Sequence, residues 1–185
     1  MNNRIDELIR ELEQLSPMPD DESPNLTVER LDRYGEVIDQ IRELVDRSPS
    51  GKDPRLIKPL IRSFGYGDAY ESYWPVISTL ERFPSEVLRP ALRDAVQAGD
   101  RGARMWAAYM LGVQRNRADV PVLIAALKDP EWKVRLNALE ALTMIGDLSA
   151  KAAMEELLDD PVEEVRKVAK EDVKALLDQR YVIRH

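Results

Sequence analysis

Histidine and cysteine, two residue types that often carry out nucleophilic, acid–base or metal chemistry, are almost absent from this 185-residue sequence. Its single histidine is His185, the last residue, and it has no cysteine. Thiolate nucleophiles, thiolate metal sites, disulfides and histidine-based triads or metal sites are therefore excluded. We expect no catalytic residue, no metal ligand and no bound cofactor.

The residue types that remain for catalysis are Asp, Glu, Lys, Tyr and Ser, and two glycine-containing stretches are candidates for phosphate binding. The carboxylates occur as pairs adjacent in sequence, such as Glu155-Glu156, which is typical of a solvated helix surface or turn. The stretch around Gly51-Lys52 lacks the upstream glycine spacing and the following hydroxyl of a phosphate-binding loop. The stretch Gly65 to Asp68 lies between predicted helices, not after a strand. The sequence therefore predicts that the protein is not an enzyme.

Composition narrows the class of partner. Apolar residues make up 44% and charged residues 33% of the chain, a balance typical of a globular protein. The net charge of -7 opposes the attraction to phosphates that drives most nucleic-acid binding. The first fifteen residues alternate charged and apolar side chains, without an apolar run that could serve as a signal or membrane span. We expect a cytoplasmic protein with no membrane partner.

An internal repeat of 31 residues organises most of the chain. The same step separates Pro90 from Pro121, Leu92 from Leu123, Pro130 from Pro161 and Arg135 from Arg166. A fixed period in this range indicates stacked supersecondary units. Each unit contains two helical patterns. The first helices are predicted at 54–64, 85–97, 118–128 and 149–158, and the second helices at 68–83, 100–114, 130–145 and 161–177.

Helix-end signals punctuate these units. Asp129-Pro130 and Asp160-Pro161 each place a capping residue before a proline, which predicts helices that begin at the prolines. Gly65, Gly99 and Gly146 lie at predicted helix ends, where a left-handed conformation is expected.

The segment "DVPVLIAALKDPEWKVRLNALEALTMIGD", residues 119–147, resembles the HEAT-repeat family, specifically the short repeats of its phycobilisome-lyase-like branch. Its Asp-Pro turn, Val-Arg pair and Ala-Leu-x-x-Ile-Gly run match that branch. The resemblance extends over residues 54–177 and implies an all-α fold, an α-solenoid (α-α superhelix) of about four HEAT-like hairpins. Residues 1–53 are predicted to form an N-terminal helical extension with a Pro-rich linker, and residues 178–185 a tail.

Two amphipathic helices precede the repeats. One carries Ile5, Leu8, Ile9 and Leu12 on a single face, and the other carries Leu31, Ile38, Ile41 and Val45. The second of them is expected to cap the first repeat, because a solenoid must cover the apolar face of its terminal unit.

The two faces of the second helices are predicted to differ. In the third unit, Val134, Ala138, Ala141, Leu142 and Ile145 share the core face. On the opposite face stand Trp132, Leu136, Leu139 and Thr143, whose equivalents are Tyr70, Trp74, Ile77 and Glu81, then Arg101, Met105, Ala108 and Gly112, then Glu163, Lys167, Lys170 and Lys174. The all-charged fourth set is expected to be a C-terminal cap.

The family resemblance implies that this opposite face lines a concave surface. The partner-binding residues predicted there are Tyr70, Trp74, Arg101, Met105, Trp132 and Leu136. The alternative is that these side chains are ordinary core. Trp106 and Tyr109, one position further round, are expected to be half-buried. The column Arg104, Arg135 and Arg166 matches the family's Val-Arg arginine, which implies a structural ladder bonded to carboxylates and carbonyls, with a ligand site as the alternative.

The function expected from these features is a non-enzymatic protein-binding module, a small scaffold or adaptor with an unidentified protein partner. Within this class, a toxin-neutralising immunity protein is also consistent with the acidic charge. Two alternatives come from the resemblance. One is a lyase-like protein that handles bilins, with Arg101 beside the aromatic groove. The other is a HEAT-like DNA glycosylase, which the acidic charge disfavours.

Overall fold

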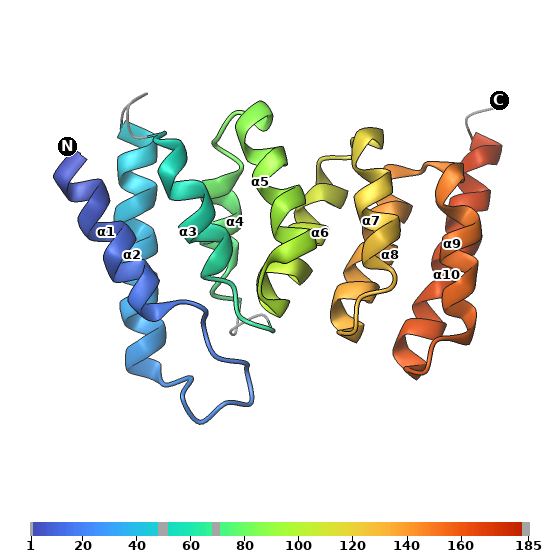
Figure 1. The fold of residues 1–185 in the computed structure, drawn as a ribbon, viewed down its shortest axis with the longest axis horizontal. Helices are drawn as coiled ribbons and strands as arrows, with labels where there is room; N and C mark the ends of the chain where they lie inside the picture. The colour runs from blue at the N-terminus through green and yellow to red at the C-terminus, as the bar shows by residue number, and fades with distance from the viewer. Residues whose placement is uncertain (1, 48–51, 68–70, 183–185) are drawn as a thin grey trace. The chain divides into compact units, whose positions relative to one another are not determined.

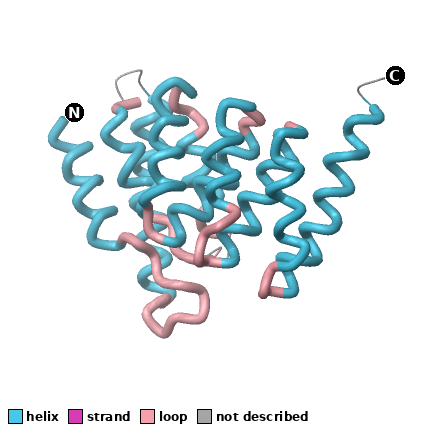
Figure 2. The backbone as a smooth tube through the Cα atoms, turned by 45° about the vertical axis from the view of Figure 1, so that its right-hand side comes forward, coloured by secondary structure: helices cyan, strands magenta, loops and turns pink. Residues whose placement is uncertain are grey.

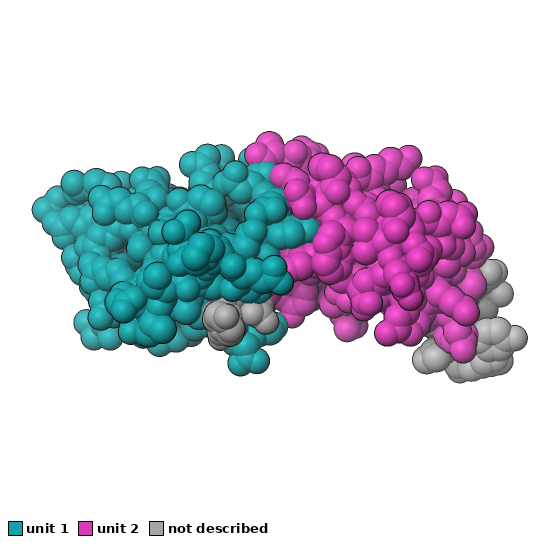
Figure 3. All heavy atoms as spheres, turned by 90° about the horizontal axis from the view of Figure 1, so that it is seen from below, with its two compact units in different colours: residues 1–95, 99–103 teal, residues 96–98, 104–185 magenta. Residues whose placement is uncertain are grey.

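The structure is a computed structural model that describes residues 2–47, 52–67 and 71–182, and within them all side chains except those of residue 2 and residues 179–182. All regular structure in these ranges is helical (Figure 2). The chain divides into two compact units, coloured separately in Figure 3. Unit 1 comprises Met1–Ala95 and Gly99–Ala103, and unit 2 comprises Val96–Ala98 and Arg104–His185.

Unit 1 contains the two N-terminal helices and the first predicted hairpins (Figure 1). Its elements are α1 (Asn2–Leu15), α2 (Val28–Arg47), the 3-10 turn η2 (Pro54–Leu56), α3 (Ile57–Arg62), α4 (Trp74–Leu80) and α5 (Ser85–Ala98), whose last three residues belong to unit 2. Helix α1 packs on both α2 and α3 through Ile5, Leu8 and Leu12, which are fully buried. The predicted apolar faces of both N-terminal helices are thus confirmed in the main, although Ile9 and Leu31 stay partly exposed.

A buried polar cluster joins α2 to the end of α3. The hydroxyls of Tyr34 and Ser63 lie 2.7 Å apart, and Ser63 also donates to Leu60 O. The Tyr34 hydroxyl therefore donates to Ser63 Oγ. The rings of Tyr34 and Tyr73 meet edge to face with centroids 6.0 Å apart. Burial raises the pKa of Tyr34 well above its ordinary value, so this hydroxyl keeps its proton.

The loop between α1 and α2 is folded onto this cluster. Met18 is 2% exposed, and its N–H donates to Ser63 O at 3.1 Å. A Cβ at Gly65 would collide with the Met18 carbonyl and with the Tyr73 hydroxyl, which accepts from the Gly65 N–H at 2.7 Å. The close approach of the loop therefore requires glycine at position 65. The Pro-rich segment between α1 and α2 is thus packed against the end of α3 at Met18, near its start.

The predicted helix 68–83 is wrong at its start. Residues 68–70 lie outside the described ranges, residues 71–73 form a turn with Glu71 at φ 69°, and α4 begins only at Trp74. The reason is Pro75, which lacks an N–H and is accommodated only in the first turn of a helix.

Unit 2 consists of consecutive helices joined by short turns. They are α6 (Arg101–Val113, in unit 2 from Arg104), η3 (Arg117–Asp119), α7 (Val120–Ala126), α8 (Trp132–Ile145), η4 (Leu148–Ala150), α9 (Lys151–Glu155), η5 (Glu156–Asp159) and α10 (Glu163–Val182). Helix α8 packs on both α7 and α10. Val134, Ala138, Ala141, Leu142 and Ile145 are all buried, which confirms the predicted core face.

The Asp-Pro pairs do not start helices in the predicted way. Helices α8 and α10 begin two residues after Pro130 and Pro161, at Trp132 and Glu163. The Asp129 carboxylate accepts from the Glu131 N–H at 2.9 Å, and Asp160 accepts from the Val162 N–H at 2.8 Å. Each Asp-Pro pair therefore forms an Asx turn just before the helix, in which the aspartate side chain accepts from the backbone N–H two residues later.

The glycine prediction holds at one position of three. Gly146 ends α8 with φ 71°, the left-handed conformation that glycine adopts without strain. Gly99 instead ends α5 in an extended conformation, and Gly65 has no positive φ. These two positions were wrongly predicted.

Candidate protein-binding surface

The predicted arginine ladder is present in unit 2. Arg104 Nε and Nη2 donate to the Asp129 carboxylate at 2.7 and 3.0 Å. Arg135 makes the same pair with Asp160 at 2.7 and 2.8 Å. Each arginine thus links the second helix of one repeat to the turn that opens the second helix of the next. The structural interpretation of this arginine column is confirmed for Arg104 and Arg135.

Arg135 also binds the turn that precedes its own helix. Arg135 Nη1 donates to the carbonyls of Asp129 and Pro130, at 2.9 and 3.2 Å. The Asp160 carboxylate is buried, which alone would raise its pKa. Hydrogen bonds from Arg135 and the Val162 N–H outweigh that effect and hold the pKa of Asp160 below its ordinary value. The Arg135–Asp160 pair is therefore a charged structural link in which both side chains have hydrogen-bond partners.

Two of the predicted partner-binding residues lie together on α8. Trp132 and Leu136 are one turn apart on the same helix face, and both are partly exposed. The ammonium group of Lys133 lies 5.8 Å from the centre of the Trp132 ring, within the range of a cation–π interaction. This partly apolar, cation-flanked face of α8 is the best candidate surface in unit 2.

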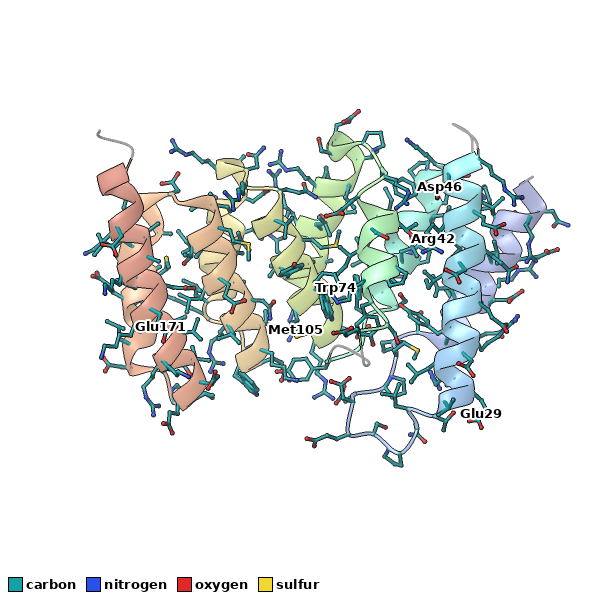
Figure 4. The ribbon with its side chains drawn as sticks, turned by 180° about the vertical axis from the view of Figure 1, so that it is seen from behind. Glu29, Arg42, Asp46, Trp74, Met105 and Glu171 are labelled. Carbon is teal, nitrogen blue, oxygen red and sulfur yellow. The ribbon has the colours of Figure 1, made fainter. Side chains whose placement is uncertain are left out.

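The exposure expected for the rest of this stripe is wrong. Met105 is 5% exposed, and Ala108 and Leu139 are completely buried. On α8 the reason is that the helix packs on α7 and on α10, so that its buried face is wider than one core stripe. Met105, labelled on α6 in Figure 4, does not present its side chain to solvent. Trp106 and Tyr109 are half-buried as predicted, and their rings meet edge to face at 5.8 Å.

In unit 1, the predicted residues have different surroundings. Trp74, labelled in Figure 4, is 49% exposed at the start of α4. Arg101 forms an ion pair with Asp20 of the α1–α2 loop, and its guanidinium lies 4.7 Å from the centre of the Tyr66 ring. Arg101 therefore has internal partners. Tyr70 lies outside the described residues.

A pair of half-buried acids between α8 and α10 was not anticipated. Burial raises the pKa of Glu140, and the neighbouring Asp172 raises it further. Burial also raises the pKa of Asp172 against an opposing hydrogen bond with Thr143, and Asp172 Oδ2 is buried without a hydrogen-bond partner. The signal in the sequence was Asp172 itself, because it occupies the repeat position that Ala141 fills in the preceding unit.

The described residues contain no group of three or more His, Cys, Asp or Glu side chains arranged to hold a metal ion. Within the same part of the chain, no helix combines the length and apolar character needed to span a bilayer.

Comparison with known proteins places the repeats in a family. The profile of HEAT repeats matches residues 89–174. The phycocyanobilin lyase subunit alpha of Picosynechococcus sp. (strain ATCC 27264 / PCC 7002 / PR-6) is 35% identical over an alignment of 105 residues. The match covers 51% of this chain but only 39% of that protein. Among solved structures, human deoxyhypusine hydroxylase is similar with a TM-score of 0.54 and 17% identity, over 96% of this chain and 75% of that one. At that identity the likeness concerns the fold alone, and it agrees with the predicted α-solenoid class.

Proposed function

Because residues 89–174 match HEAT repeats, we propose that this chain is a non-enzymatic module that binds a protein partner. The observation that carries the proposal is the face of α8 on which Trp132 and Leu136 stand side by side, partly exposed. Helical repeats offer such side chains on a rigid scaffold, because each helix is fixed by its neighbours.

The chemistry of this face suits a protein better than a small polar ligand. Tryptophan is enriched among residues that dominate binding energy, since it buries a large area at small entropic cost. Leu136 adds apolar area one turn away, and Lys133 adds a positive charge at the edge of the Trp132 ring. In unit 1, Trp74 offers a second exposed tryptophan to a partner.

The test is affinity capture from an extract of the cells that make the protein. The wild type is compared with a Trp132→Glu, Leu136→Glu double variant and with a Leu148→Glu control, because Leu148 is an exposed leucine of the same unit. Circular dichroism checks that all three are equally helical. We expect a protein captured by the wild type and the control and lost from the double variant. Identical captures from all three proteins would reject the α8 face.

Within this class, the net charge of -7 supports an immunity protein that neutralises a basic toxin. Such a complex should have an association rate that falls steeply with ionic strength. A captured partner with a net negative charge would contradict this finer proposal and leave the binding module intact.

A second candidate function rests on the 35% identity to a phycocyanobilin lyase subunit over part of its length. The proposal is that the chain handles an open-chain tetrapyrrole, with aromatic side chains such as Trp132 against the pigment. Arg101, the cation expected beside the pigment, is already paired with Asp20. Titration of phycocyanobilin with the purified protein tests the candidate. A saturable absorbance shift that Trp132→Glu removes would support it, and an unchanged spectrum would reject it.

A further inference from the structure

The repeat that ends in α10 presents one half of the arginine ladder without the other half. Arg166 Nη1 donates to the carbonyls of Asp160 and Pro161, at 2.6 and 3.1 Å. This repeats the way Arg135 holds the carbonyls of Asp129 and Pro130. The guanidinium of Arg166 is thus anchored by the same backbone contacts that orient Arg135.

In the described part of the chain, the other edge of the Arg166 guanidinium, formed by Nε and Nη2, lacks the carboxylate that completes the pattern in the preceding repeats. Arg104 and Arg135 use Nε and Nη2 to hold a carboxylate 25 residues further on. Among the residues that the structure describes, none places a carboxylate against Nε and Nη2 of Arg166. The Arg166 guanidinium is planar and is held by two carbonyls through Nη1. Its Nε and Nη2 have the geometry that binds a carboxylate through two parallel hydrogen bonds.

An apolar residue of the same repeat is also uncovered. Leu127 and Leu158 occupy the same position in successive repeats, 31 residues apart. Leu127, which is followed by another hairpin, is 2% exposed, whereas Leu158 is 41% exposed. Arg166 and Leu158 thus correspond to Arg135 and Leu127 of the preceding repeat, but Arg166 has no carboxylate partner within the described ranges and Leu158 is exposed.

The charges on α10 indicate what kind of helix would dock. Lys167, Lys170 and Lys174 are exposed and stand three or four residues apart, where the preceding repeat has Leu136, Leu139 and Thr143. These lysines, here called the lysine stripe, and Arg166 give α10 a local positive charge beside the exposed Glu163 and Glu171, which favours an acidic group on the partner. It disfavours a plain continuation of the apolar stacking.

We propose that this end of unit 2, formed by Arg166, Leu158 and the lysine stripe of α10, is a docking site for another polypeptide. The occupant is a helix preceded by an aspartate, as in an Asp-Pro turn, whose carboxylate binds Nε and Nη2 of Arg166. A second copy of this chain is a poorer occupant, because its own Asp129 and Asp160 are held by Arg104 and Arg135. The site uses none of the residues of the Trp132–Leu136 face and does not depend on the function proposed for it.

The probe is a peptide with the sequence of residues 148–178, in which the residue equivalent to Arg166 is glutamine so that the peptide cannot stack on itself. The aspartate of the peptide that is equivalent to Asp160 should form a bidentate ion pair with Arg166 of the full chain, as Asp160 does with Arg135 in the structure. Fluorescence anisotropy of the labelled peptide measures Kd, with a matched peptide in which that aspartate is asparagine.

We expect the aspartate peptide to bind the wild-type chain about tenfold or more tightly than the asparagine peptide, because a bidentate charged pair is lost in the latter. In Arg166→Gln the two peptides should bind equally weakly. Arg117→Gln, which removes an exposed positive charge of unit 2 outside the proposed site, should change Kd less than about threefold.

Three results would overturn the proposal. The first is equal affinity of the two peptides for the wild type, and the second is no binding of either one up to about millimolar concentration. The third comes from sedimentation of the chain alone. A dimer that Arg166→Gln dissociates would assign the site to a second copy instead of another polypeptide.

Discussion

Arg135 and Asp160, 25 residues apart in the sequence, form a bidentate ion pair in which both residues are nearly inaccessible to solvent, at 8% and 5% exposure. The aspartate also closes the turn before α10, and the arginine also holds the turn before α8. One pair therefore fixes the start of two helices.

Arg135→Met should consequently destabilise the protein by about 3 kcal/mol, because it leaves the Asp160 carboxylate buried without its main partner. Urea denaturation followed by circular dichroism measures the change. The control is Arg117→Met, since Arg117 is exposed and its ion pair with Asp147 is long, at 3.8 Å; its effect should stay below about 1 kcal/mol. Equal losses of unfolding free energy in both variants would show that the buried ion pair stabilises the protein no more than the exposed one.

The same pair sets a pH dependence at the acid end. The pKa of Asp160 is lower in the folded state than its ordinary value. Its stabilisation is therefore present above the ordinary pKa and lost as the pH falls through the folded pKa. In Arg135→Met the acid limb of the stability profile should become shallower. A profile parallel to that of the wild type below pH 4, about the ordinary aspartate pKa, would contradict this assignment.

Glu140 and Asp172 should act in the opposite direction. Burial raises the folded-state pKa of both carboxyls. Their contribution is most favourable below the ordinary pKa and is lost as the pH rises through the raised one. Asp172→Asn should therefore stabilise the protein at pH 7, by on the order of 0.5 kcal/mol because both groups are half-exposed and screened by solvent. Glu163→Gln, on the exposed start of α10, should have no comparable effect. A destabilised Asp172→Asn would mean that its hydrogen bond with Thr143 dominates.

Two glycine substitutions should have opposite signs. Gly146→Ala places a side chain at φ 71° and should cost about 1 kcal/mol. Gly35→Ala lies inside α2, where an added Cβ meets nothing within 4 Å, and should stabilise by about 0.5–1 kcal/mol. Thermal denaturation of the two variants side by side checks the contrast. A stabilised Gly146→Ala would refute the left-handed helix end.

Met105→Glu and Trp132→Glu should differ as well. Met105 is 5% exposed, so a glutamate there buries an unpaired charge or its protonated form and should cost several kcal/mol. Trp132 is partly exposed, so Trp132→Glu should cost much less while still affecting partner binding. The free energy of unfolding of each variant decides the question. Comparable losses would indicate that Trp132 is core.

The fold could be predicted from the sequence because the 31-residue period repeats the same physical information several times. The core face of α8 and the arginine column follow from residues that recur in register, such as Val134 and Arg135. The failures concern details that a single residue decides. Pro75 shortens α4, and the Asp129 and Asp160 side chains close turns before their helices begin.

The candidate surface was predictable only in part. Helical spacing identified the face that carries Trp132 and Leu136, but it could not give burial, because that depends on how many neighbours a helix packs against. Met105 and Leu139 share this face and are nevertheless buried. The partner of Arg101 was equally hidden, since Asp20 is 81 residues away in a loop without a periodic pattern.

The loop between α1 and α2 is packed against the protein at its start and exposed at its tip, which makes the tip a site for insertions. Its first residues are held by Met18, whereas Glu22, Pro24 and Asn25 are exposed and keep only short local hydrogen bonds around Ser23. Exposed loop tips of this kind tolerate foreign sequence. An epitope tag or a labelling cysteine inserted at residues 22–25 would thus leave both flanking helices in place, and the absence of any native cysteine would make such a label site-specific.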